Sequence, residues 1–277
     1  MSLTELRFVK AHADRPDLIG VLSLNRPDAA NALNAEMLQA LASQLQAATA
    51  NEHCRALVLR GHGKHFSAGA DLDWMRAAAE LDVAGNLRDA KILTKVFEAL
   101  ANLQVPTLAL VHGSAFGGAV GLAACCDIVI ASATARFCLS EVKLGLMPAV
   151  IMPYLARKML PGQLRRHALN AKVFSGAEAY DFGLVQRVTA EGDVGGEVAL
   201  REELNALLQG SPTAQKAIKA LHERIVADSF KQAAYTAEGI ATLRVSASGQ
   251  AGLKAFFAQQ ATPWAMTLNP NWRLDVP

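Results

Sequence analysis

The sequence predicts an α/β fold, in which short strands alternate with amphipathic helices through the first two-thirds of the chain. Runs rich in branched apolar residues, such as LIGVLSL at residues 18–24, have the length and composition of buried strands. The segments between these runs place leucines at helical spacing or contain glycine turns. Each strand therefore leads towards a helix or a tight turn, which is the arrangement typical of α/β proteins.

The first expected strand, residues 18–24, ends at the turn signal Asn25-Arg26-Pro27. Asn34 then stands where its side chain can cap the start of a helix. Leucines follow at helical spacing, at positions 38, 41 and 45. Three further strands are expected at residues 56–61, 107–113 and 127–131.

Beyond about residue 175 the strand signals fade and helical periods dominate. Helices are expected at residues 198–208, 217–226 and 252–259. We therefore divide the chain into a core, residues 1–200, and a C-terminal helical region, residues 201–277. These helices carry much apolar surface for so small a unit, so we expect part of it to pack against another subunit.

Composition and charge exclude several classes of protein. The 277 residues are 52% hydrophobic, which suffices for a large core. The net charge of +2 is too small to favour binding to nucleic acid or to an anionic membrane. No apolar run is long enough to span a bilayer, and MSLTELRFVK at the N-terminus lacks the apolar stretch of a signal peptide. The four cysteines form no CxxC pair, so we expect buried, reduced thiols in a cytoplasmic protein.

Two glycine turns stand out as candidate binding elements. SAFGGAVGLAA, residues 114–124, places Gly117 and Gly118 where an apolar strand should turn into a helix. HFSAGADL, residues 65–72, contains a second turn at Ala68-Gly69, where Asp71 can cap the following helix. The first N–H groups of a helix lack intrahelical acceptors, and glycine lets a ligand approach them. Both turns can therefore donate backbone hydrogen bonds.

The kind of ligand follows from what the turns lack. A phosphate loop would need GxxxxGK[ST], and a dinucleotide loop would need GxGxxG at the first strand-to-helix turn; neither is present. One donor from each turn suits a single carbonyl oxygen that becomes an oxyanion. Tight packing of a helix against a strand explains the glycines equally well on spacing alone.

Five segments, in this order, resemble the crotonase family, also called the enoyl-CoA hydratase/isomerase superfamily. The segments are NRPDAANALN (25–34), HFSAGADL (65–72), VHGSAFGGAVGLAACCDIVIA (111–131), ARFCLSEVKLGLMP (135–148) and GLKAFFAQQATPW (252–264). The resemblance implies a spiral core of ββα units with a C-terminal helical oligomerisation region, assembled as homotrimers or dimers of trimers. It also implies an acyl-CoA thioester as substrate, with no metal and no cofactor beyond the coenzyme A of the substrate itself.

The resemblance assigns roles to particular residues. The thioester oxygen would lie between the backbone N–H groups of Ala68 and Gly118, and Glu141 would be the catalytic carboxylate. The residues expected to contact substrate are Ala68, Gly69, Ala70, Asp71, Leu72, Gly117, Gly118, Gly121, Trp74 and Arg26. Arg26 and Lys64 are candidates for the CoA phosphates, although a solvated role is as plausible for both. Gln259-Gln260 stand where the family often has a Lys-Arg pair.

Gly121 departs from the pattern of many family hydratases, which carry a first glutamate three residues after the position of Gly118. A single glutamate at Glu141 is also found in some isomerases of the family, so counting carboxylates does not separate the two activities. We expect Gly121 to leave room for a branch at the β-carbon of the substrate.

The segments around the site are most similar to bacterial 3-methylglutaconyl-CoA hydratases of leucine breakdown. Water addition by Glu141 acting as general base is the implied chemistry. Three alternatives remain: an enoyl-CoA isomerase, a hydratase of an isoprenoid glutaconyl-CoA, and a non-catalytic acyl-CoA-binding protein. The expected acyl pocket lies under residues 73–95, with Arg76 or Arg88 as the partner of a distal carboxylate.

The remaining polar candidates are expected to be structural. His62, His65 and His112 lack the spacing of metal ligands. Ser67 and Ser114 lie beside the glycine turns but have no paired His–Asp motif, so we expect no nucleophilic serine.

Overall fold

A computed structural model describes residues 2–189, 196–227, 242 and 246–274 of the chain. Its main sheet has six strands in the order β1-β2-β3-β4-β6-β9, and a second sheet has three strands in the order β5-β7-β8. In the main sheet β1 pairs with β2 in antiparallel register, and the other neighbours are parallel. The predicted α/β class is confirmed.

The strands of the main sheet are β1 (Thr4–Lys10), β2 (Leu18–Leu24), β3 (Cys54–Gly61), β4 (Thr107–Val111), β6 (Ile128–Ser132) and β9 (Arg187–Thr189). Those of the second sheet are β5 (Ser114–Phe116), β7 (Arg136–Cys138) and β8 (Phe174–Ser175). The predicted strands correspond to β2, β3, β4 and β6. The other strands were not predicted, and most of them are too short to show a period.

The helices are η1 (Pro27–Ala29), α1 (Ala35–Ala50), α2 (Leu72–Ala79), α3 (Val83–Ala101), α4 (Gly118–Cys125), η2 (Glu141–Leu144), α5 (Met152–Ala156), α6 (Pro161–Asn170), α7 (Gly176–Asp181), α8 (Glu197–Leu208), α9 (Pro212–Ala227) and α11 (Ala247–Phe257). α1 begins as predicted, because the Asn34 side chain accepts a hydrogen bond from the Met37 N–H. No helix among the described residues is long and apolar enough to cross a membrane.

Successive residues of the central strands point to opposite faces of the main sheet and so form two cores. On one face Leu22 and Leu57 pack with side chains of α1, α3 and α4. On the other face Val21 and Val58 pack with α8 and with the segment that ends at Leu274. The sheet is thus covered on both sides, with α4 held in the larger core.

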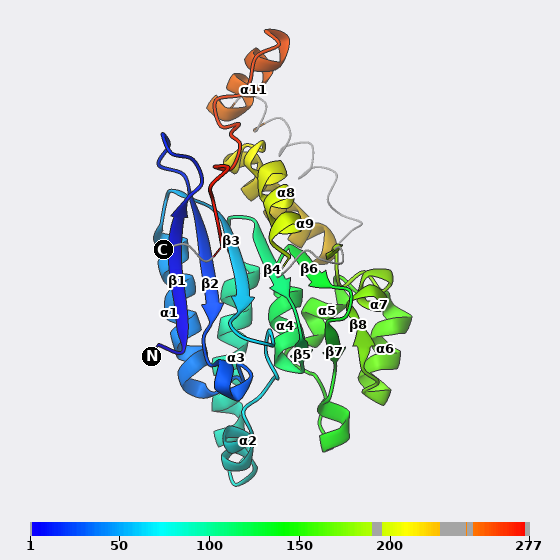
Figure 1. Cartoon of the computed structure of the whole chain (residues 1–277). Coiled ribbons are helices and arrows are strands. Elements are labelled where there is room, and N and C mark those ends of the chain that lie inside the picture. The colour runs from blue at the N-terminus through cyan, green and yellow to red at the C-terminus, as the bar shows by residue number, and fades with distance from the viewer. Residues whose placement is uncertain (1, 190–195, 228–241, 243–245, 275–277) are drawn as a thin grey trace.

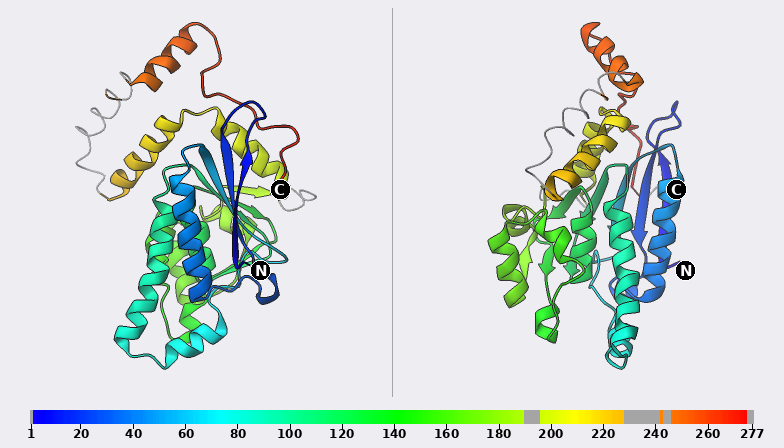
Figure 2. Two further views of the ribbon diagram at one scale, coloured as in Figure 1. Left: turned by 90° about the vertical axis from the view of Figure 1, so that its left-hand side faces the viewer. Right: turned by 180° about the vertical axis from the view of Figure 1, so that it is seen from behind.

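The C-terminal helices extend away from the end of the molecule that carries α2 (Figures 1 and 2). α11 begins at Ala247, earlier than predicted, where the Ser246 hydroxyl accepts a hydrogen bond from the Gly249 N–H. It ends at Phe257, shortly before Gln259 adopts a positive φ of 53°. The division of the chain at residue 200 falls within α8 and stays a prediction.

All four cysteines are free and buried, as expected. Burial raises the pKa of the Cys125 thiol, and it raises the pKa of the Cys126 thiol to about 12. Both thiols are therefore protonated at neutral pH and packed as small apolar groups.

Candidate active site

The glycine turn at Ala68-Gly69, which comes first in the chain, is held tightly against the second turn, at Gly117-Gly118. Gly69 has φ of +93°, and a Cβ at this position would stand 2.6 Å from the carbonyl oxygen of Phe116. Only glycine fits such a conformation and such a close approach. Gly69 is therefore needed for the packing of the two turns, whether or not a ligand is bound.

Backbone hydrogen bonds join the two turns directly. The Ser67 N–H donates to the Ser114 carbonyl (3.0 Å), and the Phe116 N–H donates to the Ser67 carbonyl (3.2 Å). These bonds form a short parallel bridge between Ser67 and Ala115. Segments nearly fifty residues apart in the sequence thus lie side by side, as the prediction of a shared site requires.

The helix that follows the first turn is capped as predicted. The Asp71 carboxylate accepts hydrogen bonds from the N–H groups of Asp73 (2.9 Å) and Trp74 (3.2 Å), and α2 begins at Leu72. Such a cap typically stabilises a helix by about 1 kcal/mol.

The second turn places a free donor at the start of α4. Gly117 has φ of +52°, and its N–H donates to the Cys138 carbonyl (2.8 Å). α4 begins with the next residue, Gly118, whose N–H has no acceptor among the described residues. The positive end of the helix lies behind this N–H, as predicted for a site that stabilises an oxyanion.

The predicted donor of the first turn is not available. The Ala68 N–H donates to the Ala30 carbonyl at 2.8 Å, which contradicts the predicted role of Ala68. Ala70 takes its place as a candidate. Leu33 bonds to the residues on either side of Ala70, through its N–H to the Gly69 carbonyl (2.7 Å) and its carbonyl to the Asp71 N–H (2.9 Å).

In such a parallel bridge the residue between the two bonded neighbours directs its own N–H to the opposite side. The Ala70 N–H accordingly faces away from Leu33 and has no acceptor within the described part of the chain. Spacing alone does not separate Ala68 from Ala70, because the bond to Ala30 depends on a distant segment.

Glu141 lies directly against the second turn. Its Oε1 is 3.2 Å from the point where a Cβ on Gly117 would stand, so the missing side chain makes room for the carboxylate. Its Oε2 is buried and has no hydrogen-bond partner among the described residues. Burial raises the pKa of this carboxyl above the ordinary glutamate value. A desolvated carboxylate with one oxygen that has no partner among the described residues, beside a free N–H donor, is the arrangement of a general base.

The space over Gly121 is filled. A Cβ on Gly121 would stand 2.2 Å from Cγ2 of Ile151 and 3.2 Å from Cζ of Phe97. The expectation that Gly121 leaves room for a branch of the substrate is therefore wrong in this structure. Ile151 was not singled out from the sequence, since nothing local marks a buried isoleucine as a neighbour of α4.

Arg26 contacts the chain itself. Its Nη1 lies 2.5 Å from Asp71 Oδ2 and also donates to the Ala32 carbonyl at 3.2 Å. Arg26 thus connects the N-terminal segment to the cap of α2, and its predicted contact with CoA stays a prediction.

The residues of the expected acyl pocket lie on α2 and α3. Trp74 is partly buried against the main core, and its indole N–H donates to Asp89 (3.1 Å). Leu72 is exposed. Arg76 forms a solvent-exposed ion pair with Asp73 on its own helix, whereas Arg88 is exposed and has no ion-pair partner within the described part of the chain.

The histidines near the turns make structural contacts. His65 Nδ1 accepts a hydrogen bond from the Ser114 N–H (3.2 Å), and His112 Nε2 lies 2.8 Å from the Gly63 carbonyl. Across residues 2–189, 196–227, 242 and 246–274, no group of three His, Cys, Asp or Glu side chains is placed to hold a metal ion.

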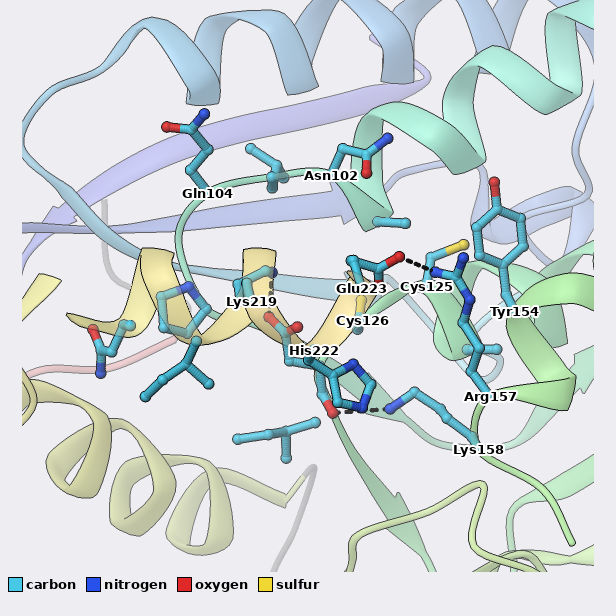
Figure 3. A pocket seen from close by; sticks show the side chains of 18 of the residues that line it. Asn102, Gln104, Cys125, Cys126, Tyr154, Arg157, Lys158, Lys219, His222 and Glu223 are labelled. Carbon is cyan, nitrogen blue, oxygen red and sulfur yellow. Dashed lines mark hydrogen bonds and ion pairs between the residues drawn. The ribbon is translucent and has the colours of Figure 1, made fainter. Parts of the chain in front are cut away.

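A cavity of about 810 Å³ lies elsewhere, between α9 and the C-terminal ends of α3 and α4 (Figure 3). Two ion pairs lie in it: Lys219 with Asp127, and Arg157 with Glu223, each at 2.5 Å. Cys125, the last residue of α4, lines this cavity, whereas Gly118 is the first residue of the same helix. Because eight helical residues span about 12 Å, the cavity is separated from the glycine turns by the length of α4. None of the described residues predicted for the site lines this cavity.

Comparisons with known proteins match most of the chain. Residues 14–267 match the family model described as enoyl-CoA hydratase/isomerase. A putative enoyl-CoA hydratase of Thermus thermophilus is 33% identical over 247 residues, which cover 87% of this chain and 95% of that protein. The 2,3-dehydroadipyl-CoA hydratase of Escherichia coli is 34% identical over 206 residues, covering 74% of this chain and 78% of that protein.

The fold also matches solved structures. The crystal structure of an enoyl-CoA hydratase from Shewanella pealeana superposes with a TM-score of 0.86 at 37% sequence identity, covering 95% of this chain and 96% of that one. The fold expected from the family resemblance is thereby confirmed.

Proposed function

Since this chain belongs to the enoyl-CoA hydratase/isomerase family, we propose that it adds water across the α,β double bond of an enoyl-CoA thioester. The observation that carries this proposal is the position of Glu141. Its carboxylate lies against Gly117, next to the free N–H of Gly118, with one oxygen buried and unpaired among the described residues. A proton acceptor and an oxyanion donor thus stand at one turn of the chain.

The two backbone donors hold the thioester oxygen. We assign these donors to Ala70 and Gly118, whose N–H groups have no acceptor in the described part of the chain. They polarise the thioester and make the β-carbon electrophilic. Removal of one such donor typically costs about 2.7–4 kcal/mol of transition-state stabilisation.

Glu141 then moves a single proton. Its carboxylate takes a proton from water while the water oxygen bonds to the β-carbon, and the electron pair of the double bond moves to the thioester oxygen as an enolate. The resulting carboxylic acid returns the proton to the α-carbon as the enolate collapses. The net change is addition of OH and H across the double bond, and Glu141 is regenerated as a carboxylate.

We further propose 3-methylglutaconyl-CoA as the substrate. What supports this proposal is the resemblance of the motifs around the site to those of hydratases of this thioester. In addition, Gly121 and Ile151 offer no second carboxylate, so the distal carboxylate of the substrate is a suitable second acceptor for the attacking water. The Escherichia coli relative is itself named for the thioester of a dicarboxylic acid. Arg88, exposed on α3, is our candidate partner for the distal carboxylate.

The test compares Glu141→Gln with a matched exposed control, Glu52→Gln, in a spectrophotometric hydration assay. The Glu141 variant should lose at least about 10²-fold in kcat, since general acid–base groups typically contribute that much, and the Glu52 variant should lose nothing. The wild type should favour 3-methylglutaconyl-CoA over crotonyl-CoA by about tenfold in kcat/KM, or roughly 1.4 kcal/mol.

The outcomes separate the alternatives. Full activity of Glu141→Gln would refute the single-carboxylate mechanism, and equal use of both thioesters would refute the substrate assignment alone. Exchange of substrate protons without hydration would identify an isomerase. Stabilisation by acyl-CoA without any turnover would identify a binding protein.

A further inference from the structure

The face of α4 that carries its glycines is closed by a buried isoleucine. Ile151 is 2% exposed, and its Cγ2 and Cβ stand 2.2 and 2.8 Å from the point where a Cβ on Gly121 would lie. Phe97, which is fully buried, contacts the same point at 3.2 Å. The γ2 methyl group of Ile151 therefore rests directly on the backbone of α4.

This methyl group is a neighbour of the Glu141 carboxylate. Gly117 is the N-cap of α4, and Gly121 lies one turn into the helix, joined to it by the hydrogen bond from the Gly121 N–H to the Gly117 carbonyl (3.4 Å). Glu141 lies over the first glycine, and Ile151 lies over the second. Four residues of helix rise by about 6 Å along the axis.

Ile151 is also held in place. Its carbonyl accepts hydrogen bonds from the N–H groups of Tyr154 and Leu155, both at 3.1 Å, where α5 begins. A β-branched side chain has few χ1 rotamers, and Phe97 packs against the same helix face. The γ2 methyl group is thus a fixed wall.

We propose that Ile151 is a specificity-determining residue, whose γ2 methyl group limits the size of the substituent on the β-carbon of the acyl chain. This inference rests on the proposed use of acyl-CoA thioesters. Glu141 must reach a water molecule at the β-carbon, so the substituent on that carbon lies beside the carboxylate. The next surface along α4 is the γ2 methyl group, which limits how far this substituent can extend along the helix.

Two variants of Ile151 distinguish the effect of its γ2 methyl group from the effect of its Cδ1 methyl group. Ile151→Leu removes the γ2 methyl group and keeps the number of carbon atoms. Ile151→Val keeps both γ carbons and loses only Cδ1, so it is the matched control. The size limit should change in the leucine variant and persist in the valine variant.

The measurement is the dissociation constant, by isothermal titration calorimetry, of glutaryl-CoA and its 3-methyl and 3-ethyl homologues. These saturated thioesters bind without being hydrated. The wild type and Ile151→Val should bind the 3-ethyl compound about tenfold more weakly than the 3-methyl compound, and Ile151→Leu should remove most of this difference. Equal ratios in all three proteins would overturn the proposal.

A second measurement tests the contact itself. Gly121→Ala should lower the melting temperature of the wild type and of Ile151→Val, because the new Cβ meets Cγ2. In the Ile151→Leu background the same change should lower the melting temperature less, because the contact with Cγ2 is gone and only the 2.8 Å contact with Cβ and the 3.2 Å contact with Phe97 remain. An identical effect of Gly121→Ala in all three backgrounds would contradict the contact and the inference with it.

These results are independent of catalysis. A wild type that shows the size limit in binding but hydrates no enoyl-CoA would refute the proposed function and support this inference. A wild type that hydrates enoyl-CoA but shows no size limit in binding would support the proposed function and refute this inference.

Discussion

The guanidinium of Arg26 lies 2.5 Å from the carboxylate of Asp71, the residue that caps α2 directly after the first glycine turn. Hydrogen bonding from Arg26 is the main reason that the pKa of Asp71 is lowered. The same arginine donates to the Ala32 carbonyl, next to Leu33, which is bonded on both sides of Ala70. Arg26 therefore positions the segment that presents the Ala70 N–H.

Arg26→Met should reduce kcat/KM by about tenfold, because a donor displaced by a fraction of an ångström loses transition-state binding. Arg76→Met is the control. Arg76 and Asp73 form an exposed ion pair on α2, and such a pair should contribute little to the position of the Ala70 N–H. Truncated pantetheine thioesters, which lack the phosphates of CoA, should show the same loss. A loss confined to full CoA thioesters, and seen in KM alone, would instead assign Arg26 to phosphate binding.

Gly118→Val should reduce turnover by about a hundredfold or more, as for removal of an oxyanion donor. A Cβ at this position already lies 3.3 Å from Cδ1 of Leu33, and a branched side chain beside it would obstruct the thioester. Gly162→Val is the control, because a Cβ on Gly162 meets nothing within 4 Å. A folded Gly118→Val protein with undiminished turnover would exclude the proposed oxyanion site.

Glu141→Gln should raise the melting temperature at pH 8. The raised pKa of Glu141 means that the folded chain holds this proton more tightly than the unfolded chain does. Keeping Glu141 ionised therefore costs folding free energy above its folded-state pKa, and the cost disappears as the pH falls below the unfolded-state pKa.

The difference in melting temperature between wild type and Glu141→Gln should accordingly shrink as the solution is acidified, as followed by calorimetry. The activity of the wild type should fall over the same acid range, because the base becomes protonated. A difference that does not change with pH would show that Glu141 is not desolvated in the folded protein.

The C-terminal helices should mediate oligomerisation. Exposed apolar side chains lie along α9 and α11, at Ile218, Ile225, Leu253 and Phe257. Light scattering should show a trimer or a dimer of trimers, with interfaces of well over about 1,000 Å². Ile218→Asp combined with Phe257→Asp should weaken the assembly, whereas Lys216→Asp, on the same helix as Ile218, should not. A wild type that is monomeric at micromolar concentration would contradict the prediction.

The sequence by itself determined the features that depend on local chemistry. The caps at Asn34 and Asp71, the glycine turns at Gly69 and Gly117 and the buried central strands follow from signals within a few residues of one another. Family membership and the candidacy of Glu141 rest on motifs of the same local kind. Local signals of this type act through short hydrogen bonds and side-chain periodicity, so they can be read before the chain folds.

Only the tertiary structure decided which of these groups are available and what surrounds them. Ala68 loses its donor to the carbonyl of Ala30, and Arg26 is engaged by Asp71, because folding brings separate segments together. The space over Gly121 is closed by Ile151, which follows in the chain only after two further strands. The strands β5, β7 and β8 are too short to carry a period and form only because neighbours supply their hydrogen bonds. Long-range packing sets these relationships, and no local pattern encodes them.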